Sequence, residues 1–272
     1  MKTLSNHLIL FDEECPMCMG YTQLFVKTGM LNQEGRVSYQ KMPAEVCPII
    51  DRQRAVNEIA LVNIQNGEVT YGIKSIFKVI GHSLPFFKPL FTFSPFIWLM
   101  EKFYAFISYN RKVIIPAATK KEGLQPSFKL SYRLIYLLVT WLVTAYILTA
   151  YAALLTDFVP LGGRYREYII CGAQIAFQGL IIFFYKREKF WDYLGNMMSI
   201  SCAGALLLGI GLLAAKILTL PAISFLFYFM VIAGLMLLEH LRRSKLLALG
   251  FLLSITWVIY RLVVLGLILV FK

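Results

Sequence analysis

The sequence predicts two structural classes in one chain: an α/β domain over residues 1–126 and an all-α bundle of about five membrane spans over residues 127–272. The chain is 58% hydrophobic with a mean hydropathy of +0.67, which is too apolar for a soluble domain of this length. Charged residues concentrate in the first part, which holds 14 Lys/Arg and 10 Asp/Glu, whereas long uncharged runs fill the second. These observations predict a charged domain attached to a membrane region.

The α/β domain begins with the apolar run HLILF, which predicts a buried strand at residues 7–11. Apolar residues near helical spacing predict a helix over 19–29, where Gly29 is a stop signal. The Asn66-Gly67 pair is typical of a hairpin between two strands. The other expected elements are a strand at 36–42, a short helix at 43–55 and a helix at 73–82. This order, β-α-β-α-β-β-α, predicts a thioredoxin-like fold.

Residues 84–109 are dense in aromatic side chains but are interrupted by three prolines, so they do not read as a clean membrane span. The segment either packs on the α/β domain or presents an aromatic face to the membrane interface. We favour packing, and the two arrangements are compatible.

Five apolar runs approach the roughly 20 residues needed to cross a hydrocarbon core of about 30 Å. Charged or proline-containing stretches separate them, including KREKFWD and HLRRSK, which we expect to be loops. The expected spans are Leu134–Leu155, Tyr168–Tyr185, Met197–Leu218, Ala222–Leu238 and Leu246–Phe271.

The basic residues that flank these runs predict the orientation. Eight Lys/Arg fall on the side of KREKFWD and HLRRSK, and four fall on the side of PLGGRYR and Lys272. Because basic residues near membrane ends prefer the cytoplasm, we expect a bacterial-type inner-membrane protein with a cytoplasmic N-terminal domain and an outside C-terminus. The net charge of +12 is thus juxtamembrane charge, and no nucleic-acid partner is expected. The N-terminus has no signal-peptide pattern.

Cys15 and Cys18 lie at the expected junction between the first strand and the first helix. Residues three apart at a helix start lie on one face, close enough for a disulfide. Pro16 suits the first helical position, so Cys15 would lie at the helix N-terminus, where the helix dipole favours a thiolate. The acidic residues beside the cysteines oppose that effect, and we expect a Cys15 pKa of ~7.

A cytoplasmic Cys-x-x-Cys also permits other interpretations. A structural zinc site usually has four N/S ligands, and the residues that could complete one are Cys47, His7 and His82. Two inert thiols are the third alternative. We favour redox chemistry, and we expect Cys171 and Cys202 to be packing residues within the spans.

The segment FDEECPMC resembles the Asp-x-x-Cys-x-x-Cys signature of the DCC family of thioredoxin-like thiol-disulfide oxidoreductases, through Asp12, Cys15 and Cys18. A second segment, YAFISYNRKVI, resembles the Tyr…Asn-Arg segment that closes the family domain. The resemblance covers roughly residues 7–115 and implies a redox-active dithiol. The further residues that match the family are Pro16, Tyr104, Asn110 and Arg111.

Asp12 permits two roles. A partly buried carboxylate could accept the proton of Cys18 when a mixed disulfide resolves. Alternatively, Asp12 hydrogen-bonds the turn that carries the cysteines. We weigh the two roles equally.

Within the membrane region, Arg261 is an unusual charge in an apolar run. Gln174 and Gln178 offer a polar face at similar depth, and Glu167 is a candidate partner for the arginine. These groups are either a buried hydrogen-bonded contact or a polar site for a quinone, a lipid head group or a small substrate.

Together these patterns predict a membrane-anchored thiol-disulfide oxidoreductase of the protein-disulfide reductase type. Cys15 would attack and Cys18 would resolve, with no cofactor other than the redox-active disulfide itself; a quinone is the weaker alternative. The expected partners are a disulfide-bearing protein or a small thiol substrate, and the lipid bilayer. The alternative function is a non-catalytic membrane assembly or metal-handling protein whose Cys-x-x-Cys domain binds a partner or zinc.

Overall fold

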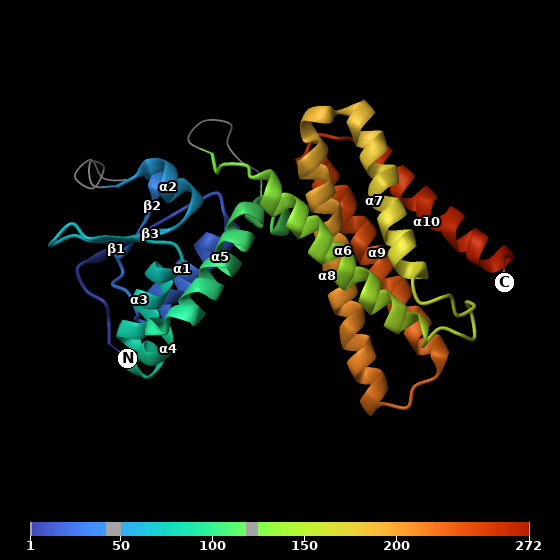
Figure 1. Cartoon of the computed structure of the whole chain (residues 1–272), viewed down its shortest axis with the longest axis horizontal. Coiled ribbons are helices and arrows are strands. Elements are labelled where there is room, and N and C mark those ends of the chain that lie inside the picture. Colours follow the sequence, from blue (N-terminus) through green and yellow to red (C-terminus); the bar gives the residue numbers. More distant parts are fainter. Residues whose placement is uncertain (1, 42–49, 118–124, 272) are drawn as a thin grey trace. The chain divides into compact units, whose positions relative to one another are not determined.

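The computed structural model describes residues 2–41, 50–117 and 125–271. They form two compact units, Met1–Tyr132 and Arg133–Lys272, which Figure 1 shows as an α/β unit and a helical unit. The expected helix at 43–55 falls partly outside the described residues, and Cys47 does so entirely.

The first unit contains a four-stranded mixed sheet in the order β2-β1-β3-β4. β1 pairs in parallel with β2 and antiparallel with β3, and β3 and β4 form the antiparallel hairpin predicted by Asn66-Gly67. Gly67 adopts a φ of 73°, which a residue with a side chain rarely adopts. The strands are β1 His7–Phe11, β2 Arg36–Ser38, β3 Ala60–Asn63 and β4 Val69–Tyr71. β2 is shorter than expected because a 3₁₀ turn, Tyr39–Lys41, follows it.

Helices cover both faces of the sheet. Phe25 of α1 and Val79 of α3 join a buried cluster with Ile9 on one face, and Ala55 of α2 packs with Leu10 on the other. This element order confirms the thioredoxin-like fold. The helices are α1 Pro16–Lys27, α2 Arg52–Asn57, α3 Ile73–Ser83, α4 Lys88–Thr92 and α5 Ser94–Ile114, with a 3₁₀ turn η3 at Pro85–Phe87.

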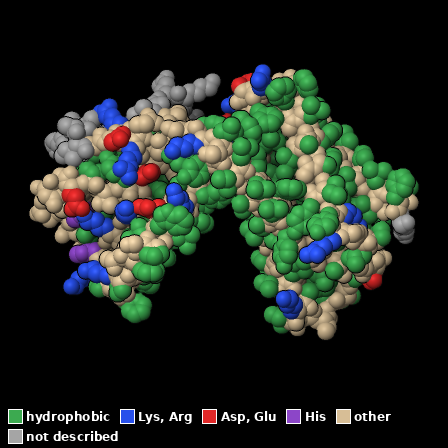
Figure 2. All heavy atoms as spheres, in the orientation of Figure 1, with side chains coloured by type: hydrophobic (Ala, Val, Ile, Leu, Met, Phe, Trp, Pro, Cys, Tyr) green, Lys and Arg blue, Asp and Glu red, His purple; other side chains and the backbone are tan. Residues whose placement is uncertain are grey.

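The second unit is a bundle of helices, and hydrophobic side chains cover much of its surface in the view of Figure 2. Five helices in the described chain are long and apolar enough to cross a membrane, and a sixth candidate is the pair Pro85–Thr92 and Ser94–Ile114, which is bent by 87°. The five helices of the bundle are α6 Leu130–Ala152, α7 Arg166–Tyr185, α8 Phe190–Ile217, α9 Ala222–Leu246 and α10 Leu252–Val270.

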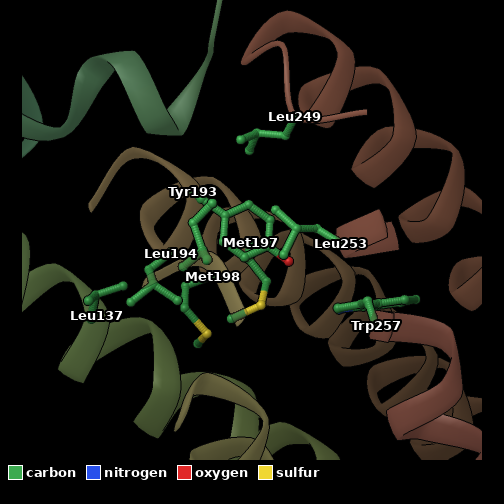
Figure 3. Close-up of a cluster of buried hydrophobic side chains, with 9 residues drawn as sticks. Leu137, Tyr193, Leu194, Met197, Met198, Leu249, Leu253 and Trp257 are labelled. Carbon is green, nitrogen blue, oxygen red and sulfur yellow. The ribbon is translucent and has the colours of Figure 1, made fainter. Parts of the chain in front are cut away.

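The core of the bundle gathers around α8. Figure 3 shows Tyr193, Leu194 and Met197 of α8 between Leu137 of α6 and Leu253 of α10. All five side chains are buried and belong to one hydrophobic cluster of the bundle core.

One expected loop is wrong, and another is shorter than expected. HLRRSK lies inside α9, where Glu239 accepts hydrogen bonds from Arg242 and Arg243 at helical spacing. The break falls later, at residues 247–251, where Gly250 has a φ of 65°. In KREKFWD, α8 already begins at Phe190. The charges of KREKFWD therefore fall at the junction between α7 and α8, whereas those of HLRRSK do not end α9.

Candidate functional site

The two cysteines lie at the start of α1, directly after the end of β1. Cys15 is the N-cap residue of the helix, and its sulfur accepts the backbone N–H of Cys18 at 3.4 Å. Pro16 occupies the first turn, as the sequence predicts. Both cysteines are buried and are free thiols. The arrangement places one sulfur directly against unpaired N–H groups at a helix N-terminus.

The surroundings of Cys15 favour its thiolate. A hydrogen bond from the Cys18 side chain lowers the pKa most, and the Cys18 N–H and the nearby Arg111 guanidinium lower it further. Burial and the Asp12 carboxylate oppose this change. The net result is a Cys15 pKa of about 6, below the ~7 expected from the sequence.

Cys18 has the opposite environment. Its hydrogen bond to Cys15 and its burial raise the pKa of the Cys18 thiol well above the ordinary value. Arg111 and the Tyr21 hydroxyl, which hydrogen-bonds the Cys18 sulfur, lower it only in part. One thiolate and one protonated thiol therefore share the site at neutral pH, which is the asymmetry that thiol-disulfide exchange requires.

A buried ion pair lies beside the cysteines. Arg111 Nη2 of α5 donates to Asp12 Oδ2 at 2.8 Å, and both side chains are about 5% exposed. The same Nη2 donates to the Val56 carbonyl at 2.8 Å. Arg111 Nε is buried with no hydrogen-bond partner. Burial lowers the pKa of Arg111, but Cys18, Cys15 and Asp12 together raise it. The guanidinium is thus a fixed positive charge close to both sulfurs.

Asp12 also organises the turn. Its Oδ1 accepts the backbone N–H of Glu14 at 3.1 Å and the Gln40 amide at 2.9 Å. Gln40 is held in turn by the Ser38 hydroxyl at 2.6 Å. Both oxygens of the carboxylate therefore accept hydrogen bonds from neighbouring donors, and one of these bonds is the turn contact considered from the sequence.

The residues that match the second family segment lie on α5. The Tyr104 hydroxyl accepts the Ile59 N–H at 3.1 Å, immediately before β3. The Asn110 amide donates to the carbonyls of Phe106 and Tyr132, and so ties α5 to the first turn of α6. Of these residues, Arg111 reaches the dithiol directly through its charge.

Sequence reasoning missed Gln40 and Tyr21. Gln40 follows β2, which is parallel to β1, so residues just beyond both strands meet at one edge of the sheet. Tyr21 lies three residues after Cys18 on the same helix face, a spacing visible in the sequence. The parallel pairing of β1 with β2 therefore places Gln40 at the site, and the spacing of the α1 residues places Tyr21 there.

No group of three His, Cys, Asp or Glu side chains able to hold a metal ion occurs among the described residues. His7, which was considered as a zinc ligand, instead has its Nδ1 at 2.8 Å from the Ser5 carbonyl.

In the bundle, Arg261 and Gln174 line one small cavity of about 10 Å³ together with Thr144 and Cys171. Arg261 Nε, Gln174 Nε2 and Thr144 Oγ1 are buried there without hydrogen-bond partners. A cavity of this size is at the lower limit for one water molecule.

The other polar groups considered for this site lie apart from that cavity. Gln178 accepts a hydrogen bond from the Tyr193 hydroxyl at 2.6 Å and donates to Thr256. The carboxylate of Glu167 pairs with Arg166 at 2.7 Å, and no ion pair joins it to Arg261. The polar face expected from the sequence is thus divided: Gln174 lines the small cavity with Arg261, whereas Gln178 bonds Tyr193 and Thr256.

Comparison with known proteins bears on the first unit. Residues 9–115 match the family model for DCC1-like thiol-disulfide oxidoreductase. No curated protein and no solved structure matches the chain. The matched range runs from β1 to the residue after α5 and contains Asp12, the cysteine pair and Arg111. Over residues 9–115, the chain is therefore similar to the DCC1-like thiol-disulfide oxidoreductase family, and apolar helices that could cross a membrane follow this range.

Proposed function

We propose that the protein is a membrane-anchored thiol-disulfide oxidoreductase whose Cys15–Cys18 dithiol reduces disulfides. The observation that carries this proposal is the asymmetry of the two sulfurs. Cys15 caps α1 with a pKa of about 6, whereas the pKa of buried Cys18 is raised. A thiolate is the attacking species in disulfide exchange, so Cys15 is the nucleophile.

The reaction has two exchange steps. The Cys15 thiolate attacks one sulfur of the substrate disulfide, a mixed disulfide forms, and the second substrate sulfur leaves as a thiolate that takes up a proton. Cys18 then loses its proton and attacks the Cys15 sulfur, which releases the first substrate sulfur as a thiol. The substrate gains two electrons and the protein ends as the Cys15–Cys18 disulfide, so a second thiol reductant must restore the dithiol.

The Asp12–Arg111 pair supports this chemistry as a positioning element. Arg111 lowers the pKa of both sulfurs, so its charge stabilises whichever of them is the thiolate at each step. Asp12 holds the guanidinium in place and also fixes the turn through the Glu14 N–H. Because its oxygens already accept hydrogen bonds, we assign Asp12 this positioning role in preference to that of proton acceptor.

The electrons in this scheme pass between sulfur atoms alone, so the reaction needs no further cofactor. The substrates that fit are a disulfide-bearing protein or a small disulfide. The five apolar helices anchor the domain, with the domain in the cytoplasm and Lys272 outside. Reporter fusions after Arg187 and after Lys272 test this orientation, and a cytoplasmic signal at Lys272 would require a different number of spans.

Trapping distinguishes this function from the alternative. In the full-length protein, Cys15→Ser should abolish reduction of a small disulfide, whereas Cys18→Ser should accumulate mixed disulfides through Cys15. Cys171→Ser, a buried thiol in α7, is the matched control and should behave as wild type. If the dithiol shows no reversible two-electron couple in a redox titration but binds zinc stoichiometrically, the metal-handling alternative replaces this proposal.

A further inference from the structure

The segment between η3 and the middle of α5 exposes an unusual number of large apolar side chains. Phe86 is 88% exposed and Trp98 is 62% exposed. Soluble domains seldom leave a concentration of this kind in water unless the surface has a partner. We call this surface the aromatic face; its members are Phe86, Phe87, Leu90, Phe93, Trp98, Leu99 and Phe103.

Stacked aromatic rings attach the aromatic face to α3. On its inner side, the rings of Phe77 and Phe91 stack with centroids 4.3 Å apart, and Phe96 stacks on Phe77 at 5.6 Å. These contacts fix α4 and α5 to α3, which packs on the sheet. The exposed side chains therefore belong to a segment whose inner rings, Phe91 and Phe96, are partly buried against Phe77 of α3.

The composition of this segment is that of a membrane-contacting element. α4 with its preceding turn and α5 together meet the length and apolarity expected of a membrane span, but the 87° bend between them prevents a straight crossing. Prolines in the first turns of η3, α4 and α5 impose the breaks. A bent apolar pair of this kind can lie along a bilayer surface.

The aromatic face is close in sequence to the first candidate membrane span. α5 ends at Ile114, and the first candidate span begins at Leu130. The intervening residues extend at most about 50 Å. Trp98 and two exposed lysines, Lys88 and Lys102, are residue types that prefer the membrane–water interface.

Charge favours lipid over an acidic protein partner. Lys74 and Lys78, which lie near this face, pair with Glu101 and Glu68 at 2.8 Å. The surface therefore offers mainly apolar area, with Lys88 and Lys102 as exposed cations beside it. We infer that the aromatic face inserts into the boundary between the head groups and acyl chains of the bilayer, so that the redox domain lies on the membrane surface.

Site-directed spin labelling of the full-length protein in lipid nanodiscs tests this inference without reference to redox activity. The background replaces Cys15, Cys18, Cys47, Cys171 and Cys202 with serine. Single cysteines are then introduced and labelled at Phe86, Leu99 and Phe103. Leu24 and Ile64 are matched controls, because they are 56% and 62% exposed but lie in α1 and in the turn between β3 and β4. Circular dichroism confirms that each labelled protein keeps its helices.

The accessibility of each label to oxygen and to a water-soluble nickel chelate separates the outcomes. We expect labels on the aromatic face to collide at least threefold more with oxygen, and at least threefold less with nickel, than the labels at Leu24 and Ile64. Low accessibility to both reagents would show that protein covers this face, either the helical unit or a second copy, and would overturn the inference. High nickel accessibility would show that the face remains in water and would overturn it equally.

Discussion

Asp12 and Arg111, 99 residues apart in the chain, form a buried ion pair of 2.8 Å beside the dithiol. The pair joins the turn after the first strand to the last turns of α5, so the two ends of the family domain meet at the site.

The first prediction concerns the hydrogen bond between the sulfurs. Because the Cys18 side chain is the largest influence that lowers the pKa of Cys15, Cys18→Ala should raise that pKa from about 6 by about one unit or more. The pH dependence of iodoacetamide alkylation measures it, since only the thiolate reacts. Alkylation at pH 6.5 should slow several-fold, with unchanged rates above pH 10. An unaltered midpoint would mean that the helix N-terminus alone sets the acidity.

The second prediction isolates the charge of Arg111. Arg111→Gln should raise the pKa of Cys15 by about one unit, because an opposite charge nearby favours the thiolate. Arg36→Gln is the control: Arg36 lies over the Phe11 ring at 4.3 Å, near the site, but is not among the groups that chiefly set the pKa of Cys15. Equal shifts in the two variants would indicate a general structural effect instead of a local charge.

The third prediction concerns stability. Asp12→Asn leaves Arg111 buried without its counter-ion, which typically costs about 3–5 kcal/mol. Hydrogen exchange of β1 and α5, followed by mass spectrometry on the full-length protein, should show faster opening of both elements. The double variant Asp12→Asn, Arg111→Met removes both charges and should open more slowly than Asp12→Asn alone. Additive effects in the double variant would show that the two side chains are not energetically coupled.

The fourth prediction contrasts two arginines of the bundle. Arg243 donates to Glu239 at 2.7 Å and to Asn196 at 3.1 Å, so Arg243→Met should lower the melting temperature in detergent by about 2–8 °C. Arg261 has no ion-pair partner among the described residues, and its Nε is unsatisfied. Arg261→Met should therefore leave the melting temperature unchanged or raise it. A larger loss for Arg261→Met would show that this arginine binds a group that stabilises the bundle.

The sequence predicts the elements whose signals are local. The apolar run before the cysteines, Pro16 at the helix start and the Asn66-Gly67 turn each depend on neighbouring residues, and each lies where the pattern indicates. The limits of α9 could not be predicted in this way. Charge counting places a loop at HLRRSK, but Glu239 neutralises the next turn of the helix and allows it to continue to Leu246.

The electrostatics of the site depend on tertiary contacts. From the sequence, Asp12 is a negative charge that opposes a thiolate. In the structure, Arg111 neutralises much of that charge, and a sequence pattern does not show that α5 returns to the first strand. The position of Gln40 likewise requires the parallel pairing of β1 with β2. The family resemblance identified Arg111 as a relevant residue, but its role comes from the fold.

Because α5 carries both Trp98 of the aromatic face and Arg111 of the site, the aromatic face affects which disulfides the dithiol can reach. Trp98 and Arg111 lie on the same uninterrupted helix, 13 residues apart, which is about 20 Å along its axis. With Trp98 in the lipid, the length of α5 holds Arg111, which lies beside the dithiol, no farther than about 20 Å from the depth of Trp98. Disulfides close to the bilayer surface would then react, while those carried on parts of a protein far from the membrane would be out of range.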